Sequence, residues 1–125
     1  MSMRLEKMFR FEAAHWLPGF PEGHKCRRLH GHSYQVRVGL IGDVDPMTGC
    51  VMDFGEISKV TRQVEAQLDH RCLNDIEGLE NPTSECLAKW IWDRVVGDLP
   101  LLADVAVEET CTTRCVYAPS RSTTA

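Results

Sequence analysis

Three histidines have the residue type and spacing that a metal site requires. His30 and His32 lie two residues apart at the start of a predicted strand, so their imidazoles point to the same side. His15 follows a stretch in which Phe9 and Phe11 alternate in phase with it. Three imidazoles suit Zn²⁺ and leave a fourth coordination position open for water or a substrate. The alternatives are hydrogen-bonded core histidines or another divalent ion, because iron, nickel and copper also accept imidazole.

Cys26 precedes the histidine pair by four residues and has basic neighbours, Lys25, Arg27 and Arg28. Positive charge and a nearby metal favour the thiolate form of a cysteine, which makes Cys26 a candidate base. The same basic cluster could bind a small anionic ligand. Without the neighbouring histidines, Cys26 would be interpreted as an inert loop residue, and His24 is expected at the surface.

Two further groups are candidates for proton transfer and ligand binding. Asp69 and His70 close a predicted helix, where the carboxylate could orient the imidazole as a proton shuttle. A histidine is also favourable at a helix C-terminus, so the pair has a structural explanation too. Glu109 shares a predicted strand face with Val105 and Val107, and a carboxylate there must be paired or bind a ligand. It could accept two N–H groups of a heterocycle, unless the strand register exposes it.

Hydrophobic patterning predicts the elements that must position these residues. Strands are expected over residues 3–12, 32–41, 50–52, 104–110 and 113–117, and helices over residues 53–68 and about 83–97. The long loop over residues 14–31 is expected to be functional. The main order is β-β-α-α-β-β, which indicates an α+β fold with a four-stranded antiparallel sheet and both helices on one face.

Length and composition indicate one domain over residues 1–118, with a disordered tail over residues 119–125. The net charge of −4 disfavours a nucleic-acid-binding surface. No apolar run approaches the roughly 20 residues of a membrane helix. The N-terminus lacks a signal-peptide pattern, so a cytoplasmic protein is expected. The six cysteines form no C-x-x-C pair and are expected to be reduced thiols.

Several motifs together resemble one known family. Residues 26–32 have the C-x-x-x-H-G-H pattern of the superfamily of 6-pyruvoyl-tetrahydropterin and 6-carboxytetrahydropterin synthases. Further landmarks are similar to that superfamily at residues 11–15, 68–70, 80–85 and 107–110. Within it, residues 21–25 and 89–93 look most like the 6-carboxytetrahydropterin synthases of queuosine (7-deazaguanine) biosynthesis.

The resemblance implies a tunnelling fold, in which three subunits join their sheets into a barrel and two trimers stack as a homohexamer. It also implies a substrate, 7,8-dihydroneopterin triphosphate, and the products 6-carboxytetrahydropterin, acetaldehyde and triphosphate. Active sites of this family lie between subunits, so Cys26 and His70 could come from different chains.

Roles transfer by position in the matching motifs. The resemblance implies that zinc is held by His15, His30 and His32, that Cys26 accepts a proton, that Asp69 and His70 form a relay, and that Glu109 anchors the pterin beside Thr83 and Ser84. Lys25, Arg27 and Arg28 are our own candidates for binding the triphosphate.

Two other functions stay open at this level. A 6-pyruvoyl-tetrahydropterin synthase would use the same residues, eliminate triphosphate and keep the side chain. A non-catalytic module would bind a pterin or a metal without turnover. The related enzyme that feeds folate synthesis fits less well, because its motif places glutamate where Cys26 stands.

Overall fold

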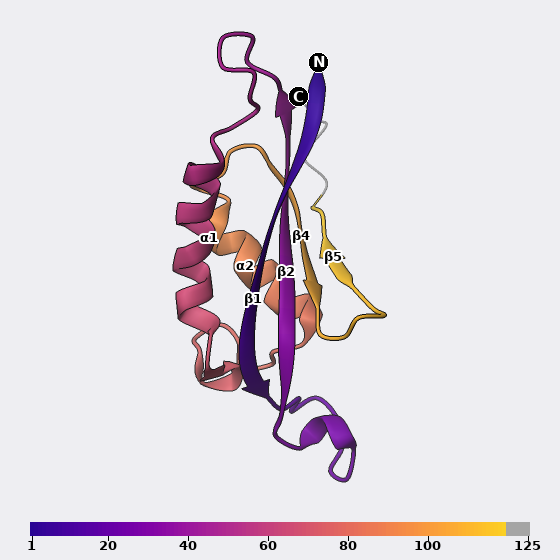
Figure 1. The fold of residues 1–125 in the computed structure, drawn as a ribbon. Coiled ribbons are helices and arrows are strands. Elements are labelled where there is room, and N and C mark those ends of the chain that lie inside the picture. Colours follow the sequence, from indigo (N-terminus) through magenta and orange to yellow (C-terminus); the bar gives the residue numbers. More distant parts are fainter. Residues whose placement is uncertain (120–125) are drawn as a thin grey trace.

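The computed structural model describes residues 1–119, which form a five-stranded sheet with two helices on one of its faces (Figure 1). The strand order is β3-β1-β2-β4-β5. The elements are β1 (Ser2–His15), β2 (His30–Asp43), α1 (Phe54–Leu68), β3 (Arg71–Cys72), α2 (Ser84–Val95), β4 (Leu102–Glu108) and β5 (Cys115–Tyr117), with short 3-10 helices at Lys25–Arg27 and Leu73–Asp75. Among these residues, no helix is both long and apolar enough to span a bilayer.

The long antiparallel hairpin of β1 and β2 forms the largest part of the sheet. Both strands are longer than predicted, because regular pairing continues down to His15 opposite His30. Alternation places Phe11 and Tyr34 on the helix-covered face, where their rings stack at 4.8 Å. This buried stacking orients the segment from which the histidines project.

Both predicted helices are present and begin at side-chain caps. The carboxylate of Asp53 accepts the N–H of Gly55 at α1, and the hydroxyl of Thr83 accepts the N–H of Cys86 at α2. Each helix turns its apolar stripe to the sheet. The buried stripe residues are Ile57, Val64 and Leu68 in α1, and Leu87, Ile91 and Val95 in α2.

The observed fold differs from the predicted one in two details, and a third prediction lies partly outside the described residues. The sheet has five strands rather than four, because Arg71 and Cys72 pair in parallel with β1. The expected strand at residues 50–52 is wrong, since these residues form a bend before α1. Of the predicted disordered tail, residues 120–125 lie outside the described residues, so the domain boundary at residue 118 stays a prediction.

Candidate metal and proton-transfer site

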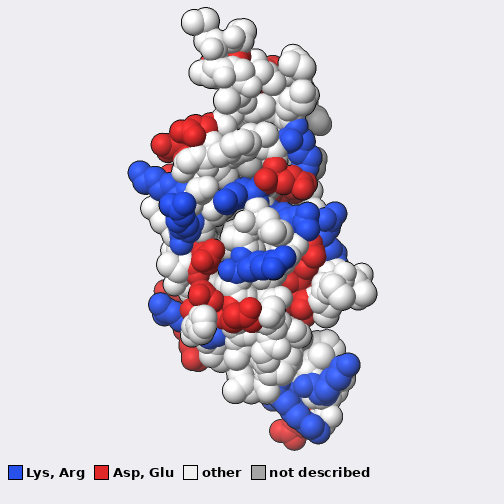
Figure 2. Space-filling model, viewed as in Figure 1, with Lys and Arg blue, Asp and Glu red and all other residues white. Residues whose placement is uncertain are grey.

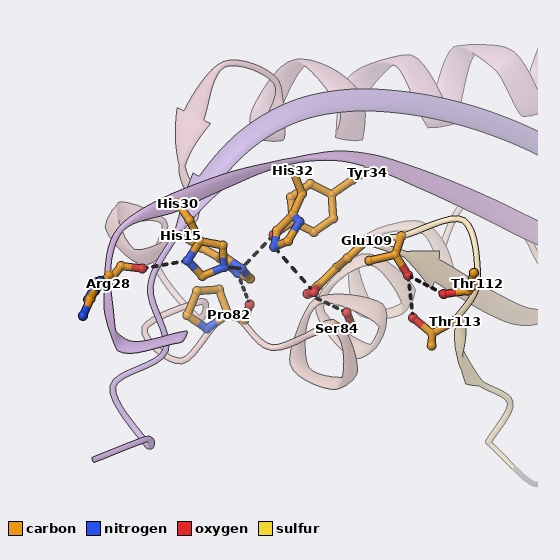
Figure 3. A network of polar contacts seen from close by, with 11 residues as sticks. His15, Arg28, His30, His32, Tyr34, Pro82, Ser84, Glu109, Thr112 and Thr113 are labelled. Carbon is orange, nitrogen blue, oxygen red and sulfur yellow. Dashed lines mark hydrogen bonds and ion pairs between the residues drawn. The ribbon is translucent and has the colours of Figure 1, made fainter. Parts of the chain in front are cut away.

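Three imidazoles converge where the β1–β2 hairpin ends (Figure 3). His15 is the last residue of β1 and faces His30, the first residue of β2, while His32 follows on the same side of β2. One ring nitrogen from each histidine lies within 4.8 Å of the others. The residues predicted to bind a metal are therefore neighbours in space.

The protonation of two rings is determined by backbone carbonyl groups. His15 Nδ1 lies 2.8 Å from the carbonyl oxygen of Pro82, and His30 Nδ1 lies 2.6 Å from that of Arg28. A carbonyl oxygen only accepts hydrogen bonds, so each Nδ1 carries the proton and each neutral ring keeps a lone pair on Nε2. Carbonyl oxygens are common partners for the second nitrogen of a metal-bound histidine.

The distance between the Nε2 atoms of His15 and His30 shows whether a metal ion fits between them. They lie 3.0 Å apart, and in the neutral rings no proton remains to join them. Facing lone pairs repel, whereas a cation between them would satisfy both. Tetrahedral zinc at about 2.0–2.1 Å from each ligand would separate two nitrogens by about 3.3 Å. The donor set of His15 and His30 thus fits a metal ion with only a small adjustment.

Burial favours the neutral, metal-binding form of His15 and His32. Desolvation lowers the pKa of His15, although its bond to Pro82 acts in the opposite direction. Desolvation likewise lowers the pKa of His32. The Tyr34 hydroxyl oxygen lies 3.0 Å from His15 Nδ1, and because burial raises the pKa of Tyr34, this phenol stays neutral. Neutral imidazole is the form that binds metals.

Glu109 is placed beside the histidines by the end of β4. Its Oε2 lies 3.7 Å from His32 Nε2, and the Ser84 hydroxyl donates to its Oε1 at 2.7 Å. Thr83 is the N-cap of α2, so its hydroxyl already accepts a backbone N–H. The carboxylate of Glu109 is therefore held by a serine from α2 and directed toward the imidazole cluster (Figure 3).

A cavity of about 400 Å³ lies over the cluster. It is lined by His15, Leu17, Lys25, Cys26, His30, His32 and Glu109. Pockets for small ligands have volumes in the range of roughly 300–1,000 Å³. The thiol, one ammonium group, the carboxylate and the three imidazoles therefore open onto one space.

Arg27 and Arg28, in the loop before β2, have different environments. The Arg27 guanidinium donates to the carbonyl oxygens of Phe20 at 2.8 Å and Pro18 at 3.4 Å, so it braces the loop. Arg28 is exposed. His24, which was expected at the surface, is half-buried, stacks on Phe20 at 4.4 Å and accepts the N–H of Cys26.

Asp69 and His70 lie elsewhere in the single chain. Asp69 accepts the backbone N–H of Glu12 at 2.9 Å, and its other oxygen lies 3.0 Å from His70 Nδ1. The bond from Glu12 and then the contact with His70 lower the pKa of Asp69. His70 has a φ of 59° and lines a second cavity, of about 560 Å³, which Cys26 does not line.

Three participants were not predicted from the sequence. Alternation along the strand already predicts Tyr34 on the same face as His30 and His32, so its contact with the cluster could have been predicted. The carbonyl groups of Pro82 and Arg28 could not, because every residue carries a carbonyl and only folding selects those that meet an imidazole.

Comparison with known proteins agrees with this arrangement. The model of the family described as 6-pyruvoyl tetrahydropterin synthase matches residues 4–120. A relative from Synechocystis sp., named 6-carboxy-5,6,7,8-tetrahydropterin synthase, is 46% identical, and the match covers 92% of each chain. A protein of the same name from Bacillus subtilis is 35% identical over 96% of this chain and 88% of its own.

The fold is shared with a solved structure as well. The Caenorhabditis elegans 6-pyruvoyl tetrahydropterin synthase superposes with a TM-score of 0.89 at 29% sequence identity. The superposition covers 96% of this chain and 97% of that one. The tunnelling fold predicted from the sequence is therefore confirmed, with one more short strand than expected.

Proposed function

Because the chain belongs to the 6-pyruvoyl tetrahydropterin synthase family, we propose that it is a zinc-dependent 6-carboxy-5,6,7,8-tetrahydropterin synthase. The substrate would be 7,8-dihydroneopterin triphosphate, and the products 6-carboxytetrahydropterin, acetaldehyde and triphosphate. The observation that carries the proposal is the shared cavity of Cys26, Glu109 and the three imidazoles. The relatives of the same name support the choice of product.

The proposed roles follow from what each side chain contacts. His15, His30 and His32 would hold zinc, and when bound the ion would supply a Lewis acid that acidifies the hydroxyl groups of the substrate side chain. Glu109, fixed by Ser84, would accept two N–H groups of the pterin and orient it. The Cys26 thiolate, in the same cavity, would take a proton from the substrate side chain.

The remaining roles concern the relay and the phosphates. Asp69 holds His70 through its carboxylate, and we assign the pair to a second proton transfer, in a site shared between two copies of the chain. Lys25 lines the cavity and Arg28 is exposed near it, so both are proposed triphosphate ligands. Arg27 is the weakest of the three candidates, since it already donates to two loop carbonyls.

The proposed setting is a cytoplasmic homohexamer in queuosine biosynthesis, with no nucleic-acid or membrane partner. The outer strands of the described sheet are short, two residues in β3 and three in β5. Because β3 pairs only with Ala13 and Ala14, the outer side of the rest of β1 has no strand partner among the described residues and could pair with a further copy, as expected for a barrel built from several sheets.

The product assay tests the proposal directly. The purified protein is incubated with zinc and 7,8-dihydroneopterin triphosphate, and acetaldehyde and pterin products are measured. We expect acetaldehyde in amounts equal to 6-carboxytetrahydropterin. A pyruvoyl product without acetaldehyde would instead support the 6-pyruvoyl-tetrahydropterin synthase alternative, to which the name of the family also points.

A second test addresses the non-catalytic alternative. Cys26→Ala should keep bound zinc but lose turnover by at least about 100-fold, the usual minimum for a general acid or base. Cys50→Ala is the matched control, because Cys50 is exposed in the connection between β2 and α1. If wild type and Cys26→Ala are equally inactive on every dihydropterin tested, the result would favour a non-catalytic binding module.

A further inference from the structure

An asparagine outside the proposed catalytic set binds the backbone beside the metal site. Asn74 lies in the short 3-10 helix after β3 and is half-buried. Its Oδ1 accepts the backbone N–H of Trp16 at 3.0 Å, and its Nδ2 donates to the carbonyl oxygen of Trp16 at 2.7 Å. The side chain therefore pairs with both backbone groups of one residue, as a neighbouring strand would.

Trp16 joins two parts of the proposed site. The residue before it is His15, which is fully buried in the imidazole cluster. The residue after it is Leu17, whose N–H donates to the carbonyl oxygen of Cys26 at 2.8 Å. A shift of the Trp16 backbone would therefore move a metal ligand and release the anchor of the loop that carries the thiol.

The contact completes a continuous pairing along the end of β1. Asp69 and His70 bind the backbone of Glu12, with His70 donating its N–H to the Glu12 carbonyl. Next, β3 pairs with residues 13 and 14. The backbone pairing of β3 ends there, and Asn74 continues it through its side chain to Trp16. The segment after α1 thus holds residues 12–16 in place.

We infer that Asn74 is a positioning residue, which fixes His15 for metal binding and holds the Cys26 loop over the cluster. The inference rests on the proposed function, because it assigns a purpose to the same site. The residue type matters, since an amide offers both an acceptor and a donor, whereas an ionised aspartate only accepts. At position 74 a carboxylate would face the Trp16 carbonyl oxygen and repel it.

Two readouts other than activity test the inference. Zinc affinity is measured by competition with a chromogenic chelator, and mass spectrometry follows the alkylation rates of Cys26 and Cys50 in the metal-free protein. Asn74→Ala should weaken zinc binding by about 10-fold, the lower end of the range for groups that hydrogen-bond a metal ligand directly, because Asn74 acts through the residue next to His15. It should also raise the alkylation rate of Cys26 severalfold while leaving that of the exposed Cys50 unchanged.

Asn74→Asp is the second variant and should resemble Asn74→Ala, because it keeps the bond to the Trp16 N–H but loses the donated one. If Asn74→Ala does not fold, Asn74→Asp alone can still test the inference. Gln63→Ala, which removes an amide from an exposed position of α1, is the control and should match wild type.

The outcomes separate the two proposals. Asn74 variants that melt at a lower temperature but keep wild-type zinc affinity and alkylation ratio would overturn the inference, because Asn74 would then only stabilise the fold. Wild-type behaviour of Asn74→Asp would overturn it too. A wild-type protein without zinc binding or turnover would instead refute the proposed function, while the alkylation ratio would still report on the Cys26 loop.

Discussion

At the scale of single residues, hydrogen-bond partners decide which nitrogen of each imidazole is available. Backbone carbonyls occupy Nδ1 of His15 and His30, which leaves both Nε2 atoms as electron-pair donors. Burial adds a second effect, because it disfavours the charged form of His15 and His32. The cluster is therefore prepared for a cation before any ion arrives.

Zinc binding should depend on each imidazole of the cluster. We expect about one zinc per wild-type chain and almost none in His32→Ala, since two remaining imidazoles hold the ion poorly. His24→Ala, which removes an imidazole outside the cluster, should keep its zinc. Metal content after dialysis, measured by mass spectrometry, checks both variants. Equal zinc in His32→Ala and wild type would contradict the proposed ligand set.

The stabilising effect of Asp69 should depend on pH. The N–H of Glu12, followed by His70, lowers the pKa of Asp69 below its ordinary value of 3.8. A carboxylate with a lowered pKa stabilises the fold above 3.8, and the effect is lost as pH falls through the lowered value. The melting temperature of zinc-free Asp69→Asn should therefore lie below that of wild type near neutral pH, and the gap should close in strong acid. A gap independent of pH would refute this account.

At the scale of elements, the long β1–β2 hairpin carries both the core and the site. On its open face the Arg4 guanidinium binds both oxygens of Asp104, at 2.8 and 2.6 Å, across Gly39. A Cβ at Gly39 would collide with both of these side chains. The absence of a side chain on β2 therefore allows an ion pair to bridge from β1 to β4.

Gly39→Ala should destabilise the protein by up to about 1 kcal/mol, because the added methyl group displaces the partly exposed Arg4–Asp104 ion pair. Gly19→Ala is the matched control, because a Cβ there meets nothing within 4 Å, and it should change the free energy of unfolding by less than about 0.5 kcal/mol. Urea denaturation followed by circular dichroism measures both. Equal stability of the two variants would show that the Arg4–Asp104 pair moves aside without cost.

At the scale of the whole molecule, two features of the single chain concern its partners. Lys and Arg side chains alternate with Asp and Glu across the sheet face in view, without one large basic area there (Figure 2). The charges are mixed on this face, and the expectation that nucleic acid is not a partner stays a prediction. The second feature is the separation of Cys26 and His70, which line different cavities of one chain.

Mixing two inactive variants tests whether neighbouring copies share a site. Cys26→Ala and His70→Ala are unfolded together, refolded as a mixture and assayed for turnover. If one copy supplies the thiol and another the imidazole, random assembly should restore up to roughly a quarter of wild-type activity, because one interface in four combines intact residues. Each variant refolded alone should stay inactive. A mixture that is equally inactive would place both residues in one chain.

Much of the fold could be predicted from local patterns. Alternation located the hairpin of β1 and β2, and apolar periodicity located both helices, because these signals act within a few residues. The two-residue β3 was missed, since so short a strand has no periodicity and exists only through its partner. The strand predicted at residues 50–52 was the reverse error, because this apolar stretch bends and pairs with no other strand.

For the site, residue types and spacing by themselves determined the chemistry: three imidazoles on one face, a thiol four residues upstream and a carboxylate after a strand. Only the tertiary structure decided which groups orient them, namely the backbone carbonyl of Pro82 on His15 and the side-chain amide of Asn74 on the Trp16 backbone. The chemistry of a side chain follows from its residue type alone, whereas these contacts join segments more than 50 positions apart in the sequence. Their geometry depends on how β1 packs against the connection between the helices, which no local pattern specifies.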